Sequence, residues 1–302
     1  MAEKYLSTPN DGSRIVTRRV PFDFPDDLHP HWTPHSPEFA QMWNGLSLTM
    51  PYLEPYLIRT MREGMKKVKN PATLADAAGF MAQEGQHYQM HQRFNTVLKM
   101  TYPELQTIED EMTQYYKKLS KKSLKRKLAY SAGFESMTLG ATRFIIGERR
   151  SLFAGADTRV ASFWIWHMTE ETEHKTAAFD VYQEACGNYF ARAFGVFHGT
   201  WGVFYPGMKA AILMLKKDGL WKSWRTRWRL LKEVGKFVRY VAPYLLRSTL
   251  PGHSPRFEED LEWVKEFQRR YPDGVVAEAP PLVDTNHPDM PVPEMRFKAT
   301  TA

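Results

Sequence analysis

The sequence predicts an all-α protein, built around a four-helix bundle with a helical extension at its C-terminal side. Three observations lead to this fold class. Apolar residues recur at helical spacing over long stretches, and no alternating β-branched runs bounded by turns are present. Two Glu-x-x-His motifs also each follow an earlier helix that carries a glutamate among apolar neighbours. With 302 residues, 43% of them hydrophobic, the chain can bury a substantial core.

Capping residues and prolines set the bounds of the expected helices. Ser36-Pro37 and Asn70-Pro71 each combine an N-cap residue with proline at the first helical position, which is typical of a helix start. Pro51 and Pro55 predict a kink or a restart in the first long helix. Gly187-Asn188 ends the last helix of the bundle. The expected helices span residues 37–69, 71–100, 103–120, 123–148, 156–185, 193–215, 220–250 and 256–270.

These elements divide the chain into four expected segments. Residues 1–35 lack periodicity and form an extended N-terminal arm, and residues 36–188 form the bundle. Residues 189–271 form a helical extension that contains a basic and aromatic segment. The proline-rich tail, residues 272–302, lies on the surface.

Composition excludes several classes of protein. A single cysteine, Cys186, rules out an internal disulfide framework and any site that needs several cysteines. No apolar run follows the arginines of residues 1–22, so we expect no secretory signal and a cytoplasmic location. The net charge of +7 comes from residues 216–247, which carry ten Lys or Arg against two acids. Because no nucleic-acid-reading motif accompanies that charge, we do not expect nucleic acid as a partner.

Two segments carry residues suited to metal binding. Gln83–His91 contains Glu84 and His87, and His167–His174 contains Glu171 and His174, each pair in the pattern Glu-x-x-His. Residues i and i+3 lie on one face of a helix, so each pair can reach a common point. A carboxylate and an imidazole presented together suit iron, manganese or zinc.

Each pair follows a helix with a glutamate among apolar or small residues. Glu54 precedes Glu84 by 30 residues, and Glu135 precedes Glu171 by 36. In one type of metal-binding bundle, two helices each give a glutamate and the other two each give Glu-x-x-His. Four buried carboxylates would repel one another, whereas two divalent ions would balance their charge. We therefore predict a dinuclear metal site.

Other residues are expected around these ligands. His167 shares one helix stripe with Glu171 and His174 and is predicted as a seventh ligand. His91 and Glu173 are predicted to support the ligands, with Glu173 as the hydrogen-bond partner of an imidazole and Glu170 pointing elsewhere. Glu63 shares a helix with Glu54 but lies beside basic residues, so we expect it in solvent. A hydrophobic substrate pocket is predicted from Phe134, Thr138, Trp164 and His198.

The chain resembles the ferritin-like di-iron carboxylate superfamily over residues 36–188. The segments Gln-Glu-Gly-Gln-His and Glu-Glu-Thr-Glu-His-Lys-Thr-Ala-Ala-Phe-Asp look like those of the bacterial family of predicted metal-dependent hydrolases. The pattern His-x-x-x-Glu-x-x-His is similar to that of the di-iron arylamine N-oxygenases. In those enzymes the additional histidine binds iron, which implies the same role for His167. The resemblance implies a ferritin-like four-helix bundle.

We predict from these features a di-iron oxidase or oxygenase. Two Fe ions would activate O2 and oxidise a hydrophobic small molecule such as an acyl chain, a terpenoid or an aromatic amine. A dry, glutamate-rich site suits O2 chemistry because it excludes water, and turnover then needs a ferredoxin-type electron donor. One alternative is a dinuclear metal-dependent hydrolase with Mn or Zn. Another is a non-catalytic metal-binding or membrane-associated scaffold.

The extension raises the question of membrane contact. Residues 193–215 are apolar and about 20 residues long, but Pro206 and Lys209 interrupt them, so we do not expect them to cross a bilayer. Residues 220–250 combine Lys and Arg with Trp, Leu and Phe, a composition typical of helices in a lipid interface. Two interpretations stay open: peripheral contact with an anionic membrane at its inner face, and a basic helix that covers the bundle with its Trp rings facing inward. A homodimer is a further expectation.

Overall fold

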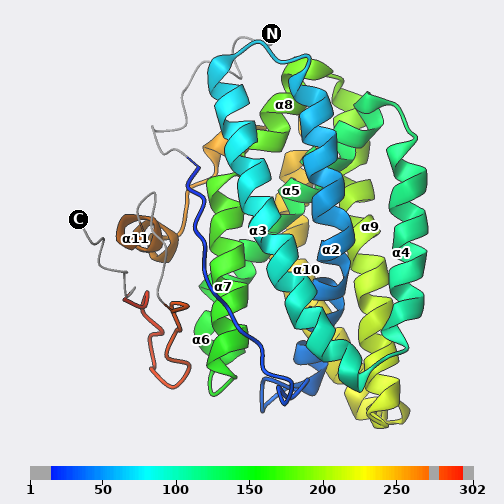
Figure 1. Cartoon of the computed structure of the whole chain (residues 1–302), viewed down its shortest axis with the longest axis vertical. Coiled ribbons are helices and arrows are strands. Elements are labelled where there is room, and N and C mark those ends of the chain that lie inside the picture. Colours follow the sequence, from blue (N-terminus) through cyan, green and yellow to red (C-terminus); the bar gives the residue numbers. More distant parts are fainter. Residues whose placement is uncertain (1–14, 272–278, 295–302) are drawn as a thin grey trace.

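The computed structural model describes residues 15–271 and 279–294 and shows an all-α fold (Figure 1). No strand occurs in these residues, which confirms the predicted fold class. The predictions for residues 1–14, 272–278 and 295–302 lie outside the described residues. The helices are α2 (Pro37–Met65), α3 (Pro71–Thr101), α4 (Leu105–Ser120), α5 (Leu124–Gly147), α6 (Arg149–Phe153), α7 (Thr158–Glu173), α8 (Ala177–Ala185), α9 (Tyr189–Lys217), α10 (Trp224–Ser248) and α11 (Glu262–Arg270), with 3-10 turns at Leu220–Lys222 and Pro255–Phe257.

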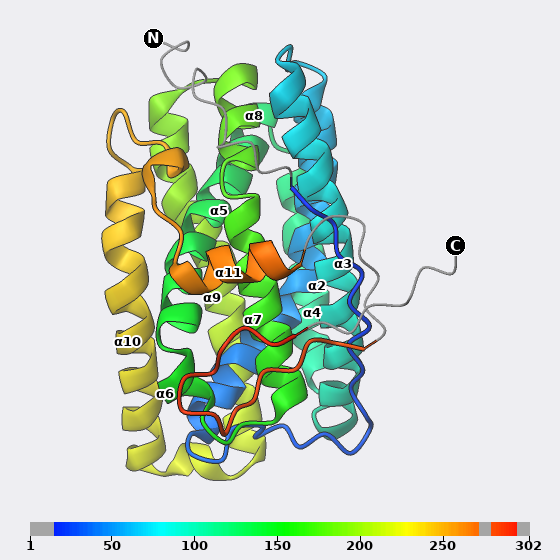
Figure 2. The same cartoon turned by 90° about the vertical axis from the view of Figure 1, so that its left-hand side faces the viewer.

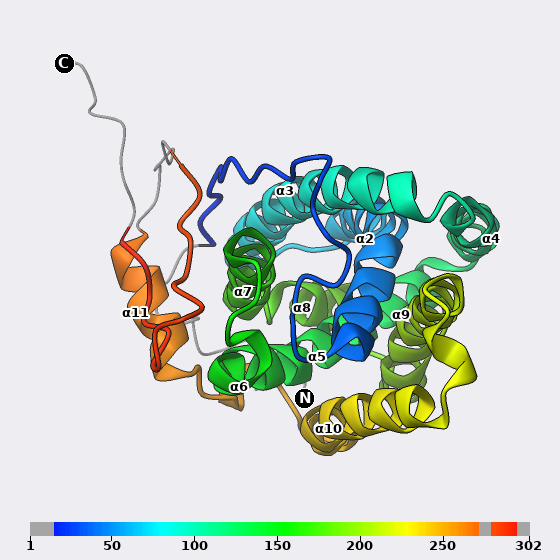
Figure 3. The same cartoon turned by 90° about the horizontal axis from the view of Figure 1, so that it is seen from below.

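Four of these helices, α2, α3, α5 and α7, surround the centre of the molecule (Figures 1 and 3). Helix α9 packs along α2 and α5, and α10 packs mainly along α5, where it forms an outer edge of the molecule (Figure 2). Helix α11 lies outside α7. Within the described ranges, no helix combines the length and the apolarity that a membrane span requires.

The predicted helix starts follow from side-chain capping. Ser36 accepts a hydrogen bond from the backbone N–H of Phe39, and Asn70 does the same for Ala72. The expected restart in the first long helix does not occur, because α2 runs without interruption through both of its prolines. Buried residues before and after the prolines pack into the same core, and this packing keeps the helix in one piece.

The predicted helix 156–185 is divided in two. Helix α7 ends at Glu173, and α8 begins only at Ala177. His174 has φ −99° and ψ 12°, outside the regular helical range, and Lys175 reaches outward to the carbonyl of Glu258 at 2.9 Å. The sequence pattern did not reveal this break, because the contacts that accompany it come from a distant segment.

Helix α9 approaches the bundle closely enough for backbones to touch. A Cβ atom at Gly133 would lie 2.0 Å from the carbonyl oxygen of Gly195, and one at Gly45 would lie 2.1 Å from that of Gly207. Glycine is required at these crossings because it has no side chain. The helical extension is therefore packed onto the bundle as an integral layer of it.

The described parts of the arm and the tail also pack against the bundle. Phe22, Phe24 and Trp32 of the arm are buried in the core. In the tail, the N–H of Val283 donates to the hydroxyl of Ser162 at 2.8 Å. These non-helical segments cover the outer side of α7, as Figure 2 shows for the tail.

Candidate metal centre

Two groups of ligand-type side chains lie next to each other inside the bundle. One ligand atom from each residue of a group lies within 4.8 Å of the others in that group. All of these side chains are buried, with at most 2% of their surface exposed. The first group is Glu54, His87 and His167, and the second is Glu84, Glu135, Glu171 and His174. The structure thus brings together all seven residues predicted from the sequence, while metal binding by them stays a prediction.

Four helices supply these residues. Helix α2 gives Glu54, α3 gives Glu84 and His87, α5 gives Glu135, and α7 gives His167 and Glu171. The last ligand, His174, is the residue that follows α7. On each long helix the paired residues are three or four apart, which places them on one face.

Glu171 joins the two groups. Its Oε1 lies 2.9 Å from Nε2 of His167 and 3.5 Å from Nδ1 of His87. Its Oε2 lies 3.1 Å from Nε2 of His174 in the second group. Burial raises the pKa of this carboxyl, but the imidazoles of His174, His167 and His87 outweigh burial and hold the pKa well below its usual range. Glu171 therefore presents one carboxylate oxygen to each group.

The other three glutamates are poorly compensated by the protein alone. Burial, the largest cause, raises the pKa of Glu54, Glu84 and Glu135 well above the usual range, and the charge of Glu171 raises all three further. Within the described residues, both carboxylate oxygens of each lack a hydrogen-bond partner, as do Nδ1 of His87 and Nε2 of His174. Buried polar atoms are normally paired. Two divalent cations would pair these atoms and balance the four carboxylate charges, so the residues fit a dinuclear metal site.

A buried ion-pair network orients His87. Its Nε2 lies 3.0 Å from Oε2 of Glu170, and Arg18 donates to the other oxygen of Glu170 at 3.1 Å. Burial lowers the pKa of His87, but its interactions with the carboxylates of Glu170 and Glu171 outweigh burial and raise the pKa to about 10. This contact leaves Nδ1 of His87 as the atom that faces the centre.

A second network orients His167. Its Nδ1 lies 2.6 Å from Nε2 of His91, and Nδ1 of His91 lies 2.7 Å from the hydroxyl of Ser47. That hydroxyl donates to the side-chain oxygen of Asn95 at 2.8 Å. Burial lowers the pKa of His167 to about 4 and that of His91 well below its usual range, so both rings are neutral at pH 7. In the tautomer in which each ring donates from Nδ1 along this chain, the lone pair of Nε2 of His167 would be left for an ion.

Two predictions about supporting residues are wrong. Glu173 contacts no imidazole; it accepts from Arg18 at 2.6 and 2.8 Å and from Gln83 at 2.7 Å. Glu170, expected to point elsewhere, is the residue that bonds His87. The reason is the arm, which inserts the buried Arg18 beside both acids. No local pattern in α7 could indicate a partner 152 residues away.

A small apolar cavity of about 30 Å³ reaches His167. Three of the predicted pocket residues, Phe134, Thr138 and Trp164, line this cavity. The fourth, His198, does not, and its placement there is wrong. Helix α9 turns His198 toward α4, where it bonds the hydroxyl of Tyr115 at 3.1 Å and borders a separate surface cavity of about 380 Å³.

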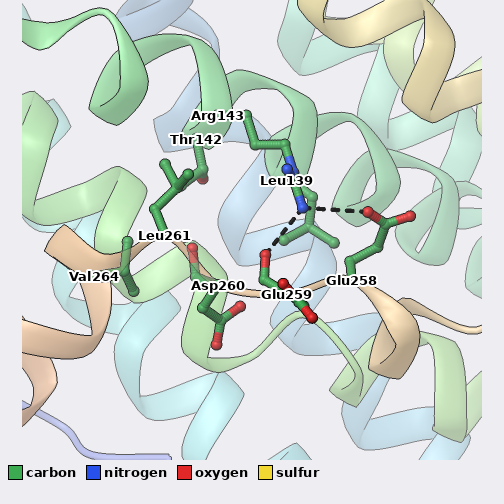
Figure 4. Close-up of a pocket in the computed structure, with 9 residues that line it drawn as sticks. Leu139, Thr142, Arg143, Glu258, Glu259, Asp260, Leu261 and Val264 are labelled. Atoms are coloured by element: carbon green, nitrogen blue, oxygen red, sulfur yellow. Dashed lines mark hydrogen bonds and ion pairs between the residues drawn. The ribbon is translucent and has the colours of Figure 1, made fainter.

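A further cavity lies outside α5 and α7 and is too small for a substrate, with about 10 Å³ of free space. Arg143 crosses it to Glu258 at 3.3 Å and to the carbonyl of Glu259 at 2.9 Å (Figure 4). Leu261 and Val264 close its other side (Figure 4). The segment before α11 thereby ties together the two helices that supply Glu135 and Glu171.

Comparison with known proteins gives one family match. A family model described as "predicted metal-dependent hydrolase" matches residues 16–259, a range that includes all seven candidate ligands and Arg18. No curated protein and no solved structure matches the chain.

Proposed function

The chain belongs to the predicted metal-dependent hydrolase family, and from this premise we propose that it is a dinuclear metal enzyme. The observation that supports the proposal best is the convergence of seven buried side chains, six of which have oxygen or nitrogen atoms without a hydrogen-bond partner among the described residues: these atoms belong to Glu54, Glu84, His87, Glu135, Glu171 and His174. Carboxylates and imidazoles together suit iron, manganese and zinc. We assign the two groups of residues to one ion each, with Glu171 shared between them.

Hydrolysis of a hydrophobic small molecule is the first candidate reaction. The family description supports it better than O2-dependent oxidation, which the sequence alone had placed first. Two divalent ions supply Lewis acidity, which polarises a carbonyl group and lowers the pKa of water toward about 7.

The side chains of the protein have separate tasks in such a reaction. Glu170 and His91 hold the rings of His87 and His167 in the orientation that ligands require. The closed packing around Glu54 and Glu135 excludes bulk water, which strengthens every electrostatic interaction at the centre. Trp164 and its neighbours in the apolar cavity would bind a nonpolar group beside His167.

Oxidation of a hydrophobic substrate is the second candidate. It is favoured by the enclosure of the centre, since the seven side chains are buried and the cavity that reaches His167 is small and apolar. Two iron ions would supply electrons to O2, and a ferredoxin-type donor would replace them. A dry interior suits this chemistry because it protects reactive species from water.

One experiment separates the two reactions. The full chain, prepared with Zn, Mn or Fe(II), is assayed against acyl esters and amides of increasing chain length, under nitrogen without reductant and in air with reductant. Our first candidate predicts metal-dependent hydrolysis under nitrogen, lost in Glu171→Ala and kept in Glu63→Ala. Glu63 is the matched control because it lies on α2 but pairs with Lys127 near the surface. Turnover that requires both O2 and reductant would contradict hydrolysis and support oxidation as the reaction of this protein.

A further inference from the structure

Helices α9 and α10 each expose a stripe of large apolar side chains. On α9 five aromatic side chains with exposed fractions from 52% to 78% recur at intervals of three or four. They are Phe190, Phe194, Phe197, Trp201 and Tyr205. On α10 the exposed fractions run from 46% to 68%. These residues are Trp224, Trp228, Leu231, Val238 and Leu246. Such spacing places each set on one side of its helix.

The two stripes adjoin. Phe204 of α9 stacks on Phe237 of α10, with ring centroids 6.0 Å apart, so the helices are neighbours (Figure 3). On the inner flank of α10, Tyr240 bonds Glu148, and Arg247 bonds Glu258 at 3.1 Å. By helical geometry the exposed apolar stripe of α10 is turned away from these residues and faces solvent next to α9. We call this combined surface the α9–α10 face.

A band of cations runs beside the stripe of α10. Within residues 220–248, the exposed basic residues that form no ion pair with a carboxylate of the described residues are Lys222, Arg225, Arg227, Arg229, Lys232 and Arg239. Lys232 lies over the ring of Trp228, 5.6 Å from its centroid. Glu233, an acidic residue of α10, forms an ion pair with Lys236 at 2.9 Å. The face is therefore both apolar and strongly cationic.

We propose that the α9–α10 face docks on an anionic lipid bilayer. Aromatic residues prefer the interface between lipid and water, and basic side chains on the polar side of such helices pair with anionic head groups. Each added cation near such a surface strengthens binding by about fivefold. A second copy of the chain fits this face less well, since a symmetric contact would bring two cationic bands together. Both helices lie in the plane of the membrane in this arrangement.

The same two helices border the apolar cavity from its outer side. Val203 of α9 and Phe237 of α10 line the cavity that reaches His167. Helices α9 and α10 would therefore lie between a hydrophobic substrate dissolved in the bilayer and the cavity that reaches His167. This step, which names a membrane-borne acyl lipid as the substrate class, rests on the proposed function.

Vesicle flotation of the full chain tests the docking. We expect binding to phosphatidylglycerol vesicles, binding at least tenfold weaker to phosphatidylcholine vesicles, and a decrease as salt is raised. The double variants Trp224→Ser/Trp228→Ser and Arg225→Glu/Arg229→Glu should each lower partitioning at least tenfold. Lys121→Glu/Lys122→Glu, which makes the same charge change at exposed positions at the end of α4, should not. Thermal unfolding of each variant shows whether the fold is kept.

Three results would overturn the docking. The first is that the protein binds neutral and anionic vesicles equally, or binds neither. The second is that the protein forms a dimer in solution that the tryptophan variants dissociate. The third is that an oligonucleotide of equal charge displaces the protein from anionic vesicles. Vesicle binding is measured on metal-free and metal-bound protein alike. Loss of docking with retained hydrolysis of soluble esters therefore contradicts this inference alone, while docking without any metal-dependent turnover contradicts the proposed function.

Discussion

Glu171 is the residue whose loss should affect both ions at once. Its two oxygens face different groups of ligands, at 2.9 Å from His167 and 3.1 Å from His174. Glu54 and Glu84, in contrast, each belong to one group. We therefore expect Glu171→Ala to lose both metal ions, and Glu54→Ala or Glu84→Ala to lose one.

The size of the effect follows from the geometry of the groups. Ligand atoms within a group lie within 4.8 Å of one another, so an ion among them lies closer than about 4 Å to each carboxylate. Two unit charges at that distance interact by about 4 kcal/mol at an effective dielectric constant of about 20. At 1.4 kcal/mol for each factor of ten, removal of the Glu171 charge should weaken metal binding by about 1000-fold or more.

Equilibrium dialysis against buffered metal, followed by elemental analysis, measures this effect. At a free metal concentration that gives two ions per wild-type chain, we expect no ion in Glu171→Ala and one in Glu54→Ala. Glu63→Ala should keep two, because that side chain is 45% exposed and pairs with Lys127. If Glu171→Ala kept one ion at wild-type affinity, the bridging role would be wrong. If it kept both, the assignment of the centre would be wrong.

Three further predictions concern the surroundings of the centre. His91→Phe removes the hydrogen-bond partner of Nδ1 of His167 and should weaken metal binding by about 10–100-fold. Competition with a chelator measures this affinity, and an unchanged value would show that the hydrogen bond does not orient His167. Gly133→Ala places a Cβ atom 2.0 Å from a carbonyl oxygen and should lower the free energy of unfolding by about 1–3 kcal/mol in denaturant titrations. Gly235→Ala, whose Cβ would have no atom within 4 Å, should raise the free energy of unfolding by up to about 1 kcal/mol. Equal effects of the two substitutions would contradict the close helix crossing. Between pH 7 and 9 the metal-free protein should lose stability as pH rises, because native His87, whose pKa is raised to about 10, holds a proton that the unfolded chain has released. Thermal unfolding of the metal-bound protein should lack this loss, and a rise in stability with pH in the metal-free protein would refute the sign of the shift.

Most of the helices and the two Glu-x-x-His pairs could be predicted from the sequence because both depend on local spacing. Residues three or four apart share a helix face whatever the rest of the chain does, so Glu171 and His174 could be paired before any fold was known. The capping residues Ser36 and Asn70 likewise act within a few positions. For these features, neighbouring residues contain the necessary information.

The supporting contacts could not be predicted, because they depend on tertiary packing. Arg18 reaches Glu170 across 152 positions, and Ser47 reaches His91 across 44. The direction in which His198 points depends on how α9 rotates against α4 and α5, which glycine-mediated backbone contacts determine. Periodicity gives the buried face of a helix but does not identify the helix that will cover it.

The most direct test of the dinuclear centre is an anomalous-scattering map from crystals of the metal-bound protein, collected at the absorption edge of the bound metal. We predict two peaks about 3.5–4 Å apart, the spacing usual for two-metal sites, with Glu171 between them and the other six side chains around them. A single peak, or metal bound only away from these seven residues, would contradict the account.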